Sequence, residues 1–165
     1  MNVFSGSESM FKLFKKKAVT EIYSPVDGKI ITLEEVSDPV FSSKSMGYGF
    51  AVIPESNSVF SPIVGTVVSI FPTKHAIGLV DDEDNEVLIH IGIDTVSLNG
   101  EGFTILVKEG DAVNSATQLA EVDFAFLKSA QKETTTMVIF TNLTDQEIKL
   151  SSGNTKAKSV IGKIK

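Results

Sequence analysis

From Glu21 to the C-terminus, the sequence is a succession of short runs rich in Val, Ile, Phe and Thr, separated by Gly, Pro, Asp and Asn. Runs of this length and composition, bounded by turn residues, are typical of β-strands. We predict strands at residues 21–24, 29–33, 50–53, 58–60, 65–71, 76–80, 87–91, 104–107, 118–122, 136–141 and 147–150. Only residues 122–131 predict a helix longer than one turn. Many short strands with frequent turns predict an all-β fold, either a sandwich or a barrel.

Two segments of the chain resemble each other and indicate an internal duplication. Ser24-Pro-Val-Asp-Gly-Lys-Ile-Ile31 and Ser61-Pro-Ile-Val-Gly-Thr-Val-Val68 both place a Pro/Gly turn before a β-branched run. A third turn-rich segment, residues 108–113, is similar to the β-turns of lipoyl- and biotinyl-type domains. We expect two similar half-units to build the sheets, although convergent turn chemistry also produces such patterns.

Length and composition bound the domain organisation and the classes of function. A chain of 165 residues suits one domain with a sizeable core, which we assign to residues 19–165. No apolar run is long enough to span a bilayer, and the start lacks the order of a signal peptide, so we expect a cytoplasmic location. The chain has no cysteine, which excludes disulfides, thiolate metal ligands and thiol nucleophiles.

Charge is distributed unevenly along the chain. Residues 1–17 contain four lysines and one glutamate and contribute +3 to a net charge of −6. With the apolar residues between positions 10 and 14, they predict a flexible, basic amphipathic tail at residues 1–18. Such a tail can touch an anionic membrane surface, or its apolar side chains can dock on the domain. The acidic remainder argues against nucleic-acid binding, and the chain has no arginine with which to clamp a phosphate.

His75 and His90, the only histidines in the chain, stand on either side of one predicted hairpin. Its two apolar runs flank an acidic turn at residues 81–86. If the turn is centred between Asp82 and Glu83, the histidines lie directly opposite each other, with Cβ atoms about 4.5–5.5 Å apart. A turn shifted by a residue or two keeps them neighbours. The hairpin therefore predicts a site that contains both imidazoles.

Each histidine has a candidate partner two residues away: Thr73 precedes His75, and Gly92 follows His90. Strand alternation places Thr73 on the face of His75, where its hydroxyl can hydrogen-bond the ring, and Lys74 on the other face. The Gly92 carbonyl can accept a hydrogen bond from His90 Nδ1, which leaves Nε2 with a free lone pair. A nucleophilic histidine needs that lone pair.

Two other interpretations of the histidines stay open. Strand histidines are commonly packed or solvated without any chemistry. A zinc site is the second alternative, because His75, His90 and Asp94 supply two nitrogens and one oxygen, although such a site needs a fourth ligand or a water. The sequence lacks a dinucleotide fingerprint, a Walker loop, a nucleophile elbow and the ligand spacing of a calcium loop.

Five motifs together identify a family resemblance. They are Ser24-Pro-x-x-Gly28, Asp38-Pro-Val-Phe41-Ser-Ser-Lys-Ser-Met-Gly47, Ser61-Pro-x-x-Gly65, Phe71-Pro-Thr-Lys-His75-Ala and His90-Ile-Gly-Ile-Asp94-Thr-Val-x-Leu-x-Gly100-Glu-Gly-Phe103. From about Glu21 to the C-terminus, the chain resembles the glucose-type IIA component (EIIA, glucose/glucoside family) of the bacterial phosphoenolpyruvate:sugar phosphotransferase system. The last motif is long and specific, and His75 stands at the proper spacing from it.

The resemblance implies a β-sandwich, or barrel-sandwich hybrid, with two duplicated halves. It implies a phosphotransferase component in which the phosphocarrier HPr phosphorylates His90 on Nε2. The group then passes to a cysteine in the IIB domain of a sugar permease. His75 would steady the phosphoryl oxygens, Thr73 would orient His75, and the Gly92 carbonyl would hold His90 Nδ1. Beyond the covalent phosphohistidine, the resemblance implies no cofactor.

The resemblance also implies a docking surface for HPr and IIB. Asp38 and Asp94 would face a basic partner, and HPr would supply the cations, since this chain has no arginine. The apolar rim around them would consist of Val40, Phe41, Met46, Phe71, Leu88 and Val96. Tyr48 departs from the family, which commonly has an acidic residue there. A free-standing chain suits a shared cytosolic donor with regulatory target proteins, and the alternative function is a non-catalytic regulatory or metal-binding module of the same fold.

Overall fold

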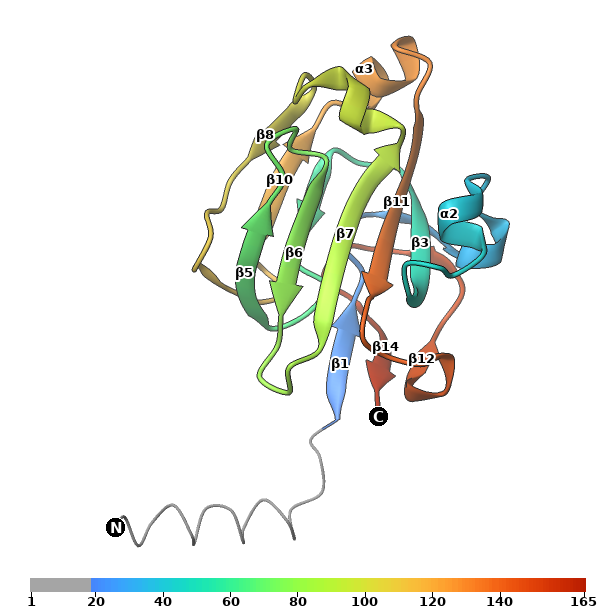
Figure 1. Ribbon diagram of the computed structural model, residues 1–165, viewed down its shortest axis with the longest axis vertical. Helices are drawn as coiled ribbons and strands as arrows, with labels where there is room; N and C mark the ends of the chain where they lie inside the picture. Colours follow the sequence, from blue (N-terminus) through green and yellow to red (C-terminus); the bar gives the residue numbers. More distant parts are fainter. Residues whose placement is uncertain (1–18) are drawn as a thin grey trace, which may run out of the picture.

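The computed structural model describes residues 19–165, so the predicted tail of residues 1–18 lies outside the described residues. One large sheet dominates the described chain (Figure 1). Its eight strands are β2 (Gly28–Thr32), β3 (Tyr48–Pro54), β5 (Gly65–Ile70), β6 (Ala76–Val80), β7 (Glu86–Ile93), β9 (Ala112–Val113), β11 (Glu133–Phe140) and β13 (Gly153–Thr155). Their order across the sheet is β13-β2-β3-β11-β7-β6-β5-β9, and the neighbours pair antiparallel.

Two three-stranded sheets complete the sandwich. The first has the order β1-β14-β12, formed by β1 (Thr20–Tyr23), β14 (Val160–Ile164) and β12 (Ile148–Leu150). The second has the order β4-β10-β8, formed by β4 (Ser58–Phe60), β10 (Gln118–Val122) and β8 (Phe103–Ile105). All three sheets contribute to one hydrophobic core, in which Ile22, Phe50, Ile89 and Leu119 are almost completely buried. The predicted all-β sandwich is confirmed.

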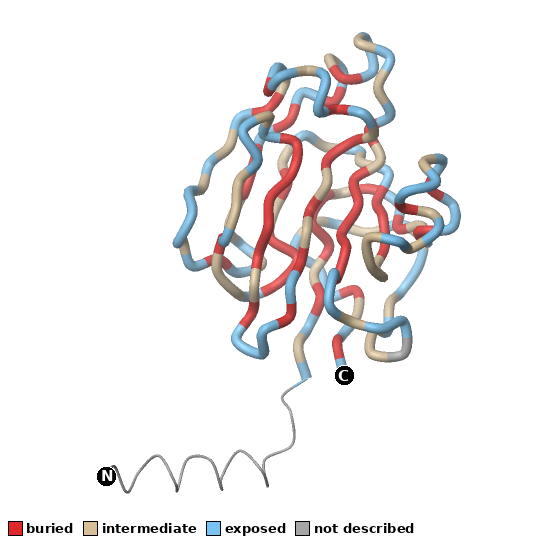
Figure 2. Tube along the Cα trace, in the orientation of Figure 1, coloured by how far each residue is buried: buried red, intermediate tan, exposed pale blue. Residues whose placement is uncertain are grey.

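The outer face of the large sheet has a second, smaller core. The segment of residues 33–46 lies over β3, β7 and β11 and buries Leu33, Val36 and Phe41 against Ala51, Met137 and Ile139. Strand β11 is therefore covered on both faces, and its last five residues are all buried (Figure 2). Leu88 and Ile93 of β7 pack against this core, so it reaches the strand that carries His90.

The duplication predicted from the two Ser-Pro-x-x-Gly segments is visible as a symmetric contact. Ser24 Oγ donates to the Val26 carbonyl over 2.9 Å, and Ser61 Oγ donates to the Ile63 carbonyl over 2.6 Å. The segments also bind each other reciprocally. The amide of Tyr23 donates to the Pro62 carbonyl over 2.8 Å, and the amide of Phe60 donates to the Pro25 carbonyl over 2.7 Å. Each Ser-Pro-x-x-Gly segment is therefore hydrogen-bonded to the residue that precedes the other segment.

Helices in residues 19–165 are short. The α-helices are α2 (Pro39–Ser42) and α3 (Phe124–Ser129), and the 3-10 helices are η1 (Leu33–Glu35), η2 (Thr95–Leu98) and η3 (Asp145–Glu147). Asp38 caps α2 by accepting from the Val40 amide over 2.8 Å, and Asp123 caps α3 by accepting from the Phe126 amide over 2.9 Å. The helix predicted within residues 122–131 is thus confirmed. None of the helices in the described part of the chain is long and apolar enough to cross a membrane.

The hairpin of β6 and β7 forms as predicted, but its register differs by one residue. Val80 pairs with Glu86, so the turn is centred on Glu83 and not between Asp82 and Glu83. The buried Asp81 carboxylate sets this turn, because its Oδ1 accepts from the amides of Glu83 and Asn85, both over 2.9 Å. The prediction that the two histidines are directly opposed is therefore wrong.

Candidate functional site

His90 lies on β7 and projects from the outer face of the large sheet. Its direct cross-strand neighbours are Ala76 on β6 and Met137 on β11. The small alanine leaves room beside the ring, whereas Met137 belongs to the buried outer core. His90 is half-buried between these neighbours.

His75 reaches the same face from the turn between β5 and β6. The turn is closed by hydrogen bonds from the Lys74 amide to the Phe71 carbonyl and from the Phe71 amide to the Ala76 carbonyl. Lys74 has a left-handed φ of 63°, so residues 73–75 are not extended. The prediction that strand alternation places these side chains is therefore wrong. The turn, not alternation, brings Thr73 to His75, and the Lys74 side chain packs beside Gly100.

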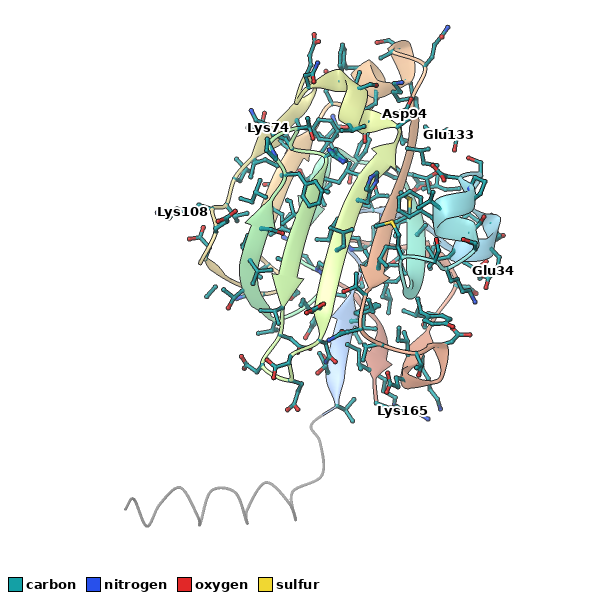
Figure 3. The ribbon with its side chains drawn as sticks, viewed as in Figure 1. Glu34, Lys74, Asp94, Lys108, Glu133 and Lys165 are labelled. Carbon is teal, nitrogen blue, oxygen red and sulfur yellow. The ribbon has the colours of Figure 1, made fainter. Side chains whose placement is uncertain are left out.

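The two imidazoles are neighbours despite the shifted register. Their ring centroids are 4.9 Å apart, and the rings meet edge to face at 77°. A backbone hydrogen bond of 2.7 Å from the Ile91 amide to the His75 carbonyl ties the two chain segments together. Both histidines of the chain thus form one site. Figure 3 labels Lys74 and Asp94, which are close to them in the sequence, at the upper end of the large sheet.

Each ring has a hydrogen-bond partner on Nδ1. Thr73 Oγ1 lies 2.7 Å from His75 Nδ1, and the Gly92 carbonyl oxygen lies 2.8 Å from His90 Nδ1. Because a carbonyl can only accept, neutral His90 carries its proton on Nδ1 and keeps the lone pair on Nε2. Gly92 has a φ of 78°, and a Cβ there would lie 2.5 Å from Thr95 Cγ2. Only glycine fits this position.

The surroundings keep both rings uncharged at neutral pH. Burial lowers the pKa of His90 to about 4, and the adjacent His75 acts in the same direction. The hydrogen bond to Gly92 and the charge of Asp38 oppose this lowering of the His90 pKa. Burial also lowers the pKa of His75, against an opposing hydrogen bond to the Thr73 backbone. The site therefore offers a neutral nitrogen nucleophile at Nε2 of His90.

Two phenylalanines enclose the histidine pair. The Phe41 ring lies 4.8 Å from the His90 ring, and the Phe71 ring lies 5.6 Å from the His75 ring, between centroids. Phe71 is 41% exposed, as expected for a rim residue, but Phe41 is only 5% exposed. The prediction of Phe41 as part of an exposed rim is therefore wrong, because α2 turns this side chain into the outer core. Phe41 instead forms the wall behind His90.

The other predicted docking residues differ in exposure. Val40 and Val96 are about half exposed, at 49% and 50%. Met46 and Leu88 are only half-buried at the edge of the outer core. Asp38 caps α2, and exposed Asp94 accepts from Lys132 Nζ over 2.8 Å. Of these residues, Asp38 lies close enough for its charge to affect the pKa of His90. Contact of these residues with a partner stays a prediction.

The zinc alternative has no assembled ligand set in the part of the chain that the structure describes. No group of three His, Cys, Asp or Glu side chains within residues 19–165 is placed to hold a metal ion. Asp94, the predicted oxygen ligand, is paired with Lys132 instead.

Several residues of the site were not predicted from the sequence. Ala76 and Met137 flank His90 because of strand pairing, and Lys132 reaches Asp94 from the turn after α3. Thr95 is completely buried next to Gly92. A signal for Thr95 existed in the sequence, since it lies within the motif that begins at His90, whereas Lys132 and Met137 required the fold.

Comparison with known proteins identifies the family of the chain. Residues 20–146 match the family model described as phosphoenolpyruvate-dependent sugar phosphotransferase system, EIIA 1. The chain is 46% identical over 151 residues to the PTS system glucose-specific EIICBA component of Streptococcus pneumoniae, covering 90% of this chain but only 21% of that protein. It is 45% identical over 122 residues to the PTS system glucose-specific EIIA component of Halalkalibacterium halodurans, covering 74% of this chain and 70% of that protein.

A solved structure shows the same fold. Glucose permease IIA from Mycoplasma capricolum superposes with a TM-score of 0.84 at 38% identity, over 90% of this chain and 97% of that one. The family match, the relatives and the shared fold thus confirm the resemblance carried by the motifs. The chain belongs to the EIIA 1 family, the glucose-type IIA components of the phosphoenolpyruvate-dependent sugar phosphotransferase system.

Proposed function

We propose that this chain is a phosphohistidine carrier that accepts a phosphoryl group from phospho-HPr on His90 Nε2. It then donates the group to a cysteine in the IIB domain of a glucose-type sugar permease. The observation that carries the proposal is the 2.8 Å hydrogen bond between His90 Nδ1 and the Gly92 carbonyl. This bond leaves the lone pair on Nε2, and the depressed pKa of His90 keeps that lone pair unprotonated at pH 7.

The transfer exchanges one phosphorus–nitrogen bond for another. The Nε2 lone pair of His90 forms a bond to phosphorus as the bond to the HPr imidazole breaks, and the electron pair of that bond leaves with the donor. The His90 proton stays on Nδ1, held by Gly92. Because phosphoryl transfer passes through a loose transition state, positioning and charge stabilisation supply most of the catalysis.

His75 is suited to stabilise the phosphoryl oxygens. Its ring lies beside His90, and Thr73 bonds its Nδ1. When the Thr73 hydroxyl donates to Nδ1, the His75 proton resides on Nε2, where it can be donated to a phosphoryl oxygen. Thr73 is then the residue that orients His75.

The docking surface for HPr and IIB surrounds the histidines. Val40, Phe71 and Val96 provide exposed apolar area, and Asp38 and Asp94 provide negative charge. Since the chain has no arginine, the partner supplies the cations. This role places the chain in the cytoplasm, where unphosphorylated and phosphorylated forms could also bind different regulatory targets.

The test is the intact mass of the chain after incubation with enzyme I, HPr and phosphoenolpyruvate. We expect a gain of one phosphate that is lost in acid and retained in alkali. The variant His90→Gln should gain none, and His75→Gln, which removes the other histidine, should still gain one. No gain on the unaltered chain, with HPr verified as phosphorylated, would overturn the proposal.

A further inference from the structure

Thr95 is a buried residue next to the site, and the proposed transfer assigns it no role. Its side chain is 0% exposed, and its Oγ1 donates to the Ile91 carbonyl over 2.6 Å. Thr95 begins η2, directly after Asp94, which has a left-handed φ of 59°. The hydroxyl therefore closes the sharp turn in which β7 ends.

The acceptor of this hydrogen bond belongs to the backbone that connects the two histidines. The Ile91 amide donates to the His75 carbonyl over 2.7 Å. The ladder between β6 and β7 ends with the pair of Ala76 and His90, so the Ile91 carbonyl lies beyond the last pair on that side. The Thr95 hydroxyl supplies a donor to this carbonyl where strand β6 no longer runs alongside.

The direction of the Ile91 carbonyl determines where Gly92 points. The Ile91 carbonyl and the Gly92 amide lie in one rigid peptide plane. Gly92 leaves that plane with a φ of 78°, and its own carbonyl accepts from His90 Nδ1 over 2.8 Å. A rotation of the peptide plane would therefore move the Gly92 carbonyl away from the ring.

The methyl group of Thr95 is also used. A Cβ built on Gly92 would lie 2.5 Å from Thr95 Cγ2, so this methyl fills the space beside the glycine. The hydroxyl holds the preceding peptide, and the methyl packs against the glycine itself. Both branches of the side chain thus restrain the same turn.

We propose that Thr95 is a positioning residue that fixes the tautomer of His90. By holding the Ile91–Gly92 peptide, it aims the Gly92 carbonyl at Nδ1 and keeps the lone pair on Nε2. Without the hydroxyl, the peptide rotates more freely and the tautomer with its proton on Nε2 becomes populated. That tautomer has no lone pair with which to attack phosphorus. The catalytic consequence rests on the proposed role of His90 as phosphoryl acceptor, whereas the effect on the tautomer does not.

The experiment compares Thr95→Val, which keeps the shape of the side chain but removes the hydroxyl, with Thr95→Ser, which keeps the hydroxyl. Thr136→Val is the matched control, because Thr136 is also 0% exposed and its hydroxyl also bonds a backbone carbonyl, that of Thr134. Imidazole ¹⁵N spectra report the tautomer, and with two histidines in the chain only two rings need assignment. The second readout is the rate at which each variant accepts phosphate from phospho-HPr.

We expect the ring of His90 to be protonated on Nδ1 in the unaltered chain, in Thr95→Ser and in Thr136→Val. In Thr95→Val we expect signal from the Nε2-protonated tautomer. We expect acceptance to slow by about ten-fold, less than the roughly 100-fold that a misplacement of about 1 Å can cost. Should the valine variant not fold, Thr95→Ala removes the same hydroxyl without needing room for a second methyl.

An unchanged His90 spectrum in the variants that lack the hydroxyl would overturn the proposal, even if acceptance were slower. A change of equal size in Thr136→Val would also overturn it. If the unaltered chain accepts no phosphate, the proposed function fails instead, and the spectra still decide whether Thr95 fixes the tautomer.

Discussion

A histidine that attacks phosphorus must be unprotonated, and burial of His90 meets this requirement at the level of a single residue. An ordinary histidine, with a pKa near 6.5, is partly charged at slightly acidic pH. With a pKa of about 4, His90 stays uncharged at such a pH. The hydrogen bond to Gly92 determines which nitrogen carries the remaining proton. Burial and the backbone thus perform separate tasks on one ring.

The lowered pKa of His90 makes stability depend on pH in a defined direction. The unfolded chain binds a proton on His90 below pH 6.5, whereas the folded chain resists protonation down to about pH 4. The contribution of His90 to the free energy of unfolding is therefore complete above pH 6.5. As the pH falls from 6.5 toward 4, this contribution decreases by about 3 kcal/mol.

We expect urea unfolding of His90→Gln to show a smaller loss of stability between pH 7.5 and pH 4.5 than the unaltered chain. The carboxylates titrate in both proteins, so their effect cancels in the comparison. His75→Gln should reduce the loss as well, because the pKa of His75 is also lowered. Equal pH dependence in His90→Gln and the unaltered chain would show that the ring is not held neutral by the fold.

The two histidines should also differ in the step they serve. His75→Gln leaves the His90 lone pair intact, so we expect it to accept phosphate from phospho-HPr. The glutamine amide does not reproduce the position of the His75 Nε2–H that would hold the phosphoryl oxygens, so donation to the IIB domain should slow by about 100-fold. Single-turnover transfer to IIB measures this step. If His75→Gln cannot be phosphorylated at all, the roles assigned to the two histidines are wrong.

At the scale of elements, α2 links the outer core to the site. Asp38 starts the helix, and Phe41 turns inward to cover one face of the His90 ring. The same side chain is 5% exposed among Leu33, Val36 and Met137. Packing of this small core therefore contributes to the burial that lowers the pKa of His90.

Removal of the Phe41 ring should change both stability and the site. We expect Phe41→Ala to lower the free energy of unfolding by about 3–5 kcal/mol. We also expect the pKa of His90 to rise toward 6.5, because the ring becomes more exposed to water. Phe103→Ala is the matched control: Phe103 has the same 5% exposure but lies in the main core on β8. NMR titration should find the His90 pKa raised in the first variant alone, and an equal rise in both would contradict a specific role for Phe41.

Local patterns predicted most strands, and the failures have physical causes. Strands β9 and β13 are two and three residues long and carry little apolar alternation, so only their partners β5 and β2 define them. In β14, Gly162 and Lys163 interrupt the apolar run. The hairpin register depended on the Asp81 carboxylate, whose hydrogen bonds to the turn amides are not encoded by apolar spacing.

The residues of the candidate site also fall into those that local patterns predict and those that only the fold brings together. Thr73 and Gly92 could be predicted because each lies two residues from its histidine, within reach of a local hydrogen bond. Phe41 was placed near the site by its motif, but its burial follows from the packing of α2 on β3 and β11. The Lys132 partner of Asp94 comes from a distant part of the chain, and no local pattern indicated it.

At the scale of the whole molecule, the proposed docking surface combines acidic groups with exposed apolar side chains. Asp38 and Asp94 provide the acidic groups, and Val40, Phe71 and Val96 are 41–50% exposed. The chain as a whole carries a net charge of −6. Apolar area of this kind favours short-lived docking, and the negative field favours encounter with a basic partner.

This arrangement predicts a steep salt dependence of phosphoryl transfer from phospho-HPr. Raising the ionic strength from 0.1 M to 1 M shortens the screening length from about 10 Å to about 3 Å, so steering by surface charges should be largely lost. Asp38→Asn should lower the second-order rate at low salt and flatten its dependence on salt. Asp82→Asn changes the net charge equally, but lies in the turn at the opposite end of β7. If the transfer rates of both variants change alike, net charge alone governs the encounter. If the rate of the unaltered chain does not depend on salt, docking relies on the apolar surface. The acidic residues at the site would then serve only its internal structure.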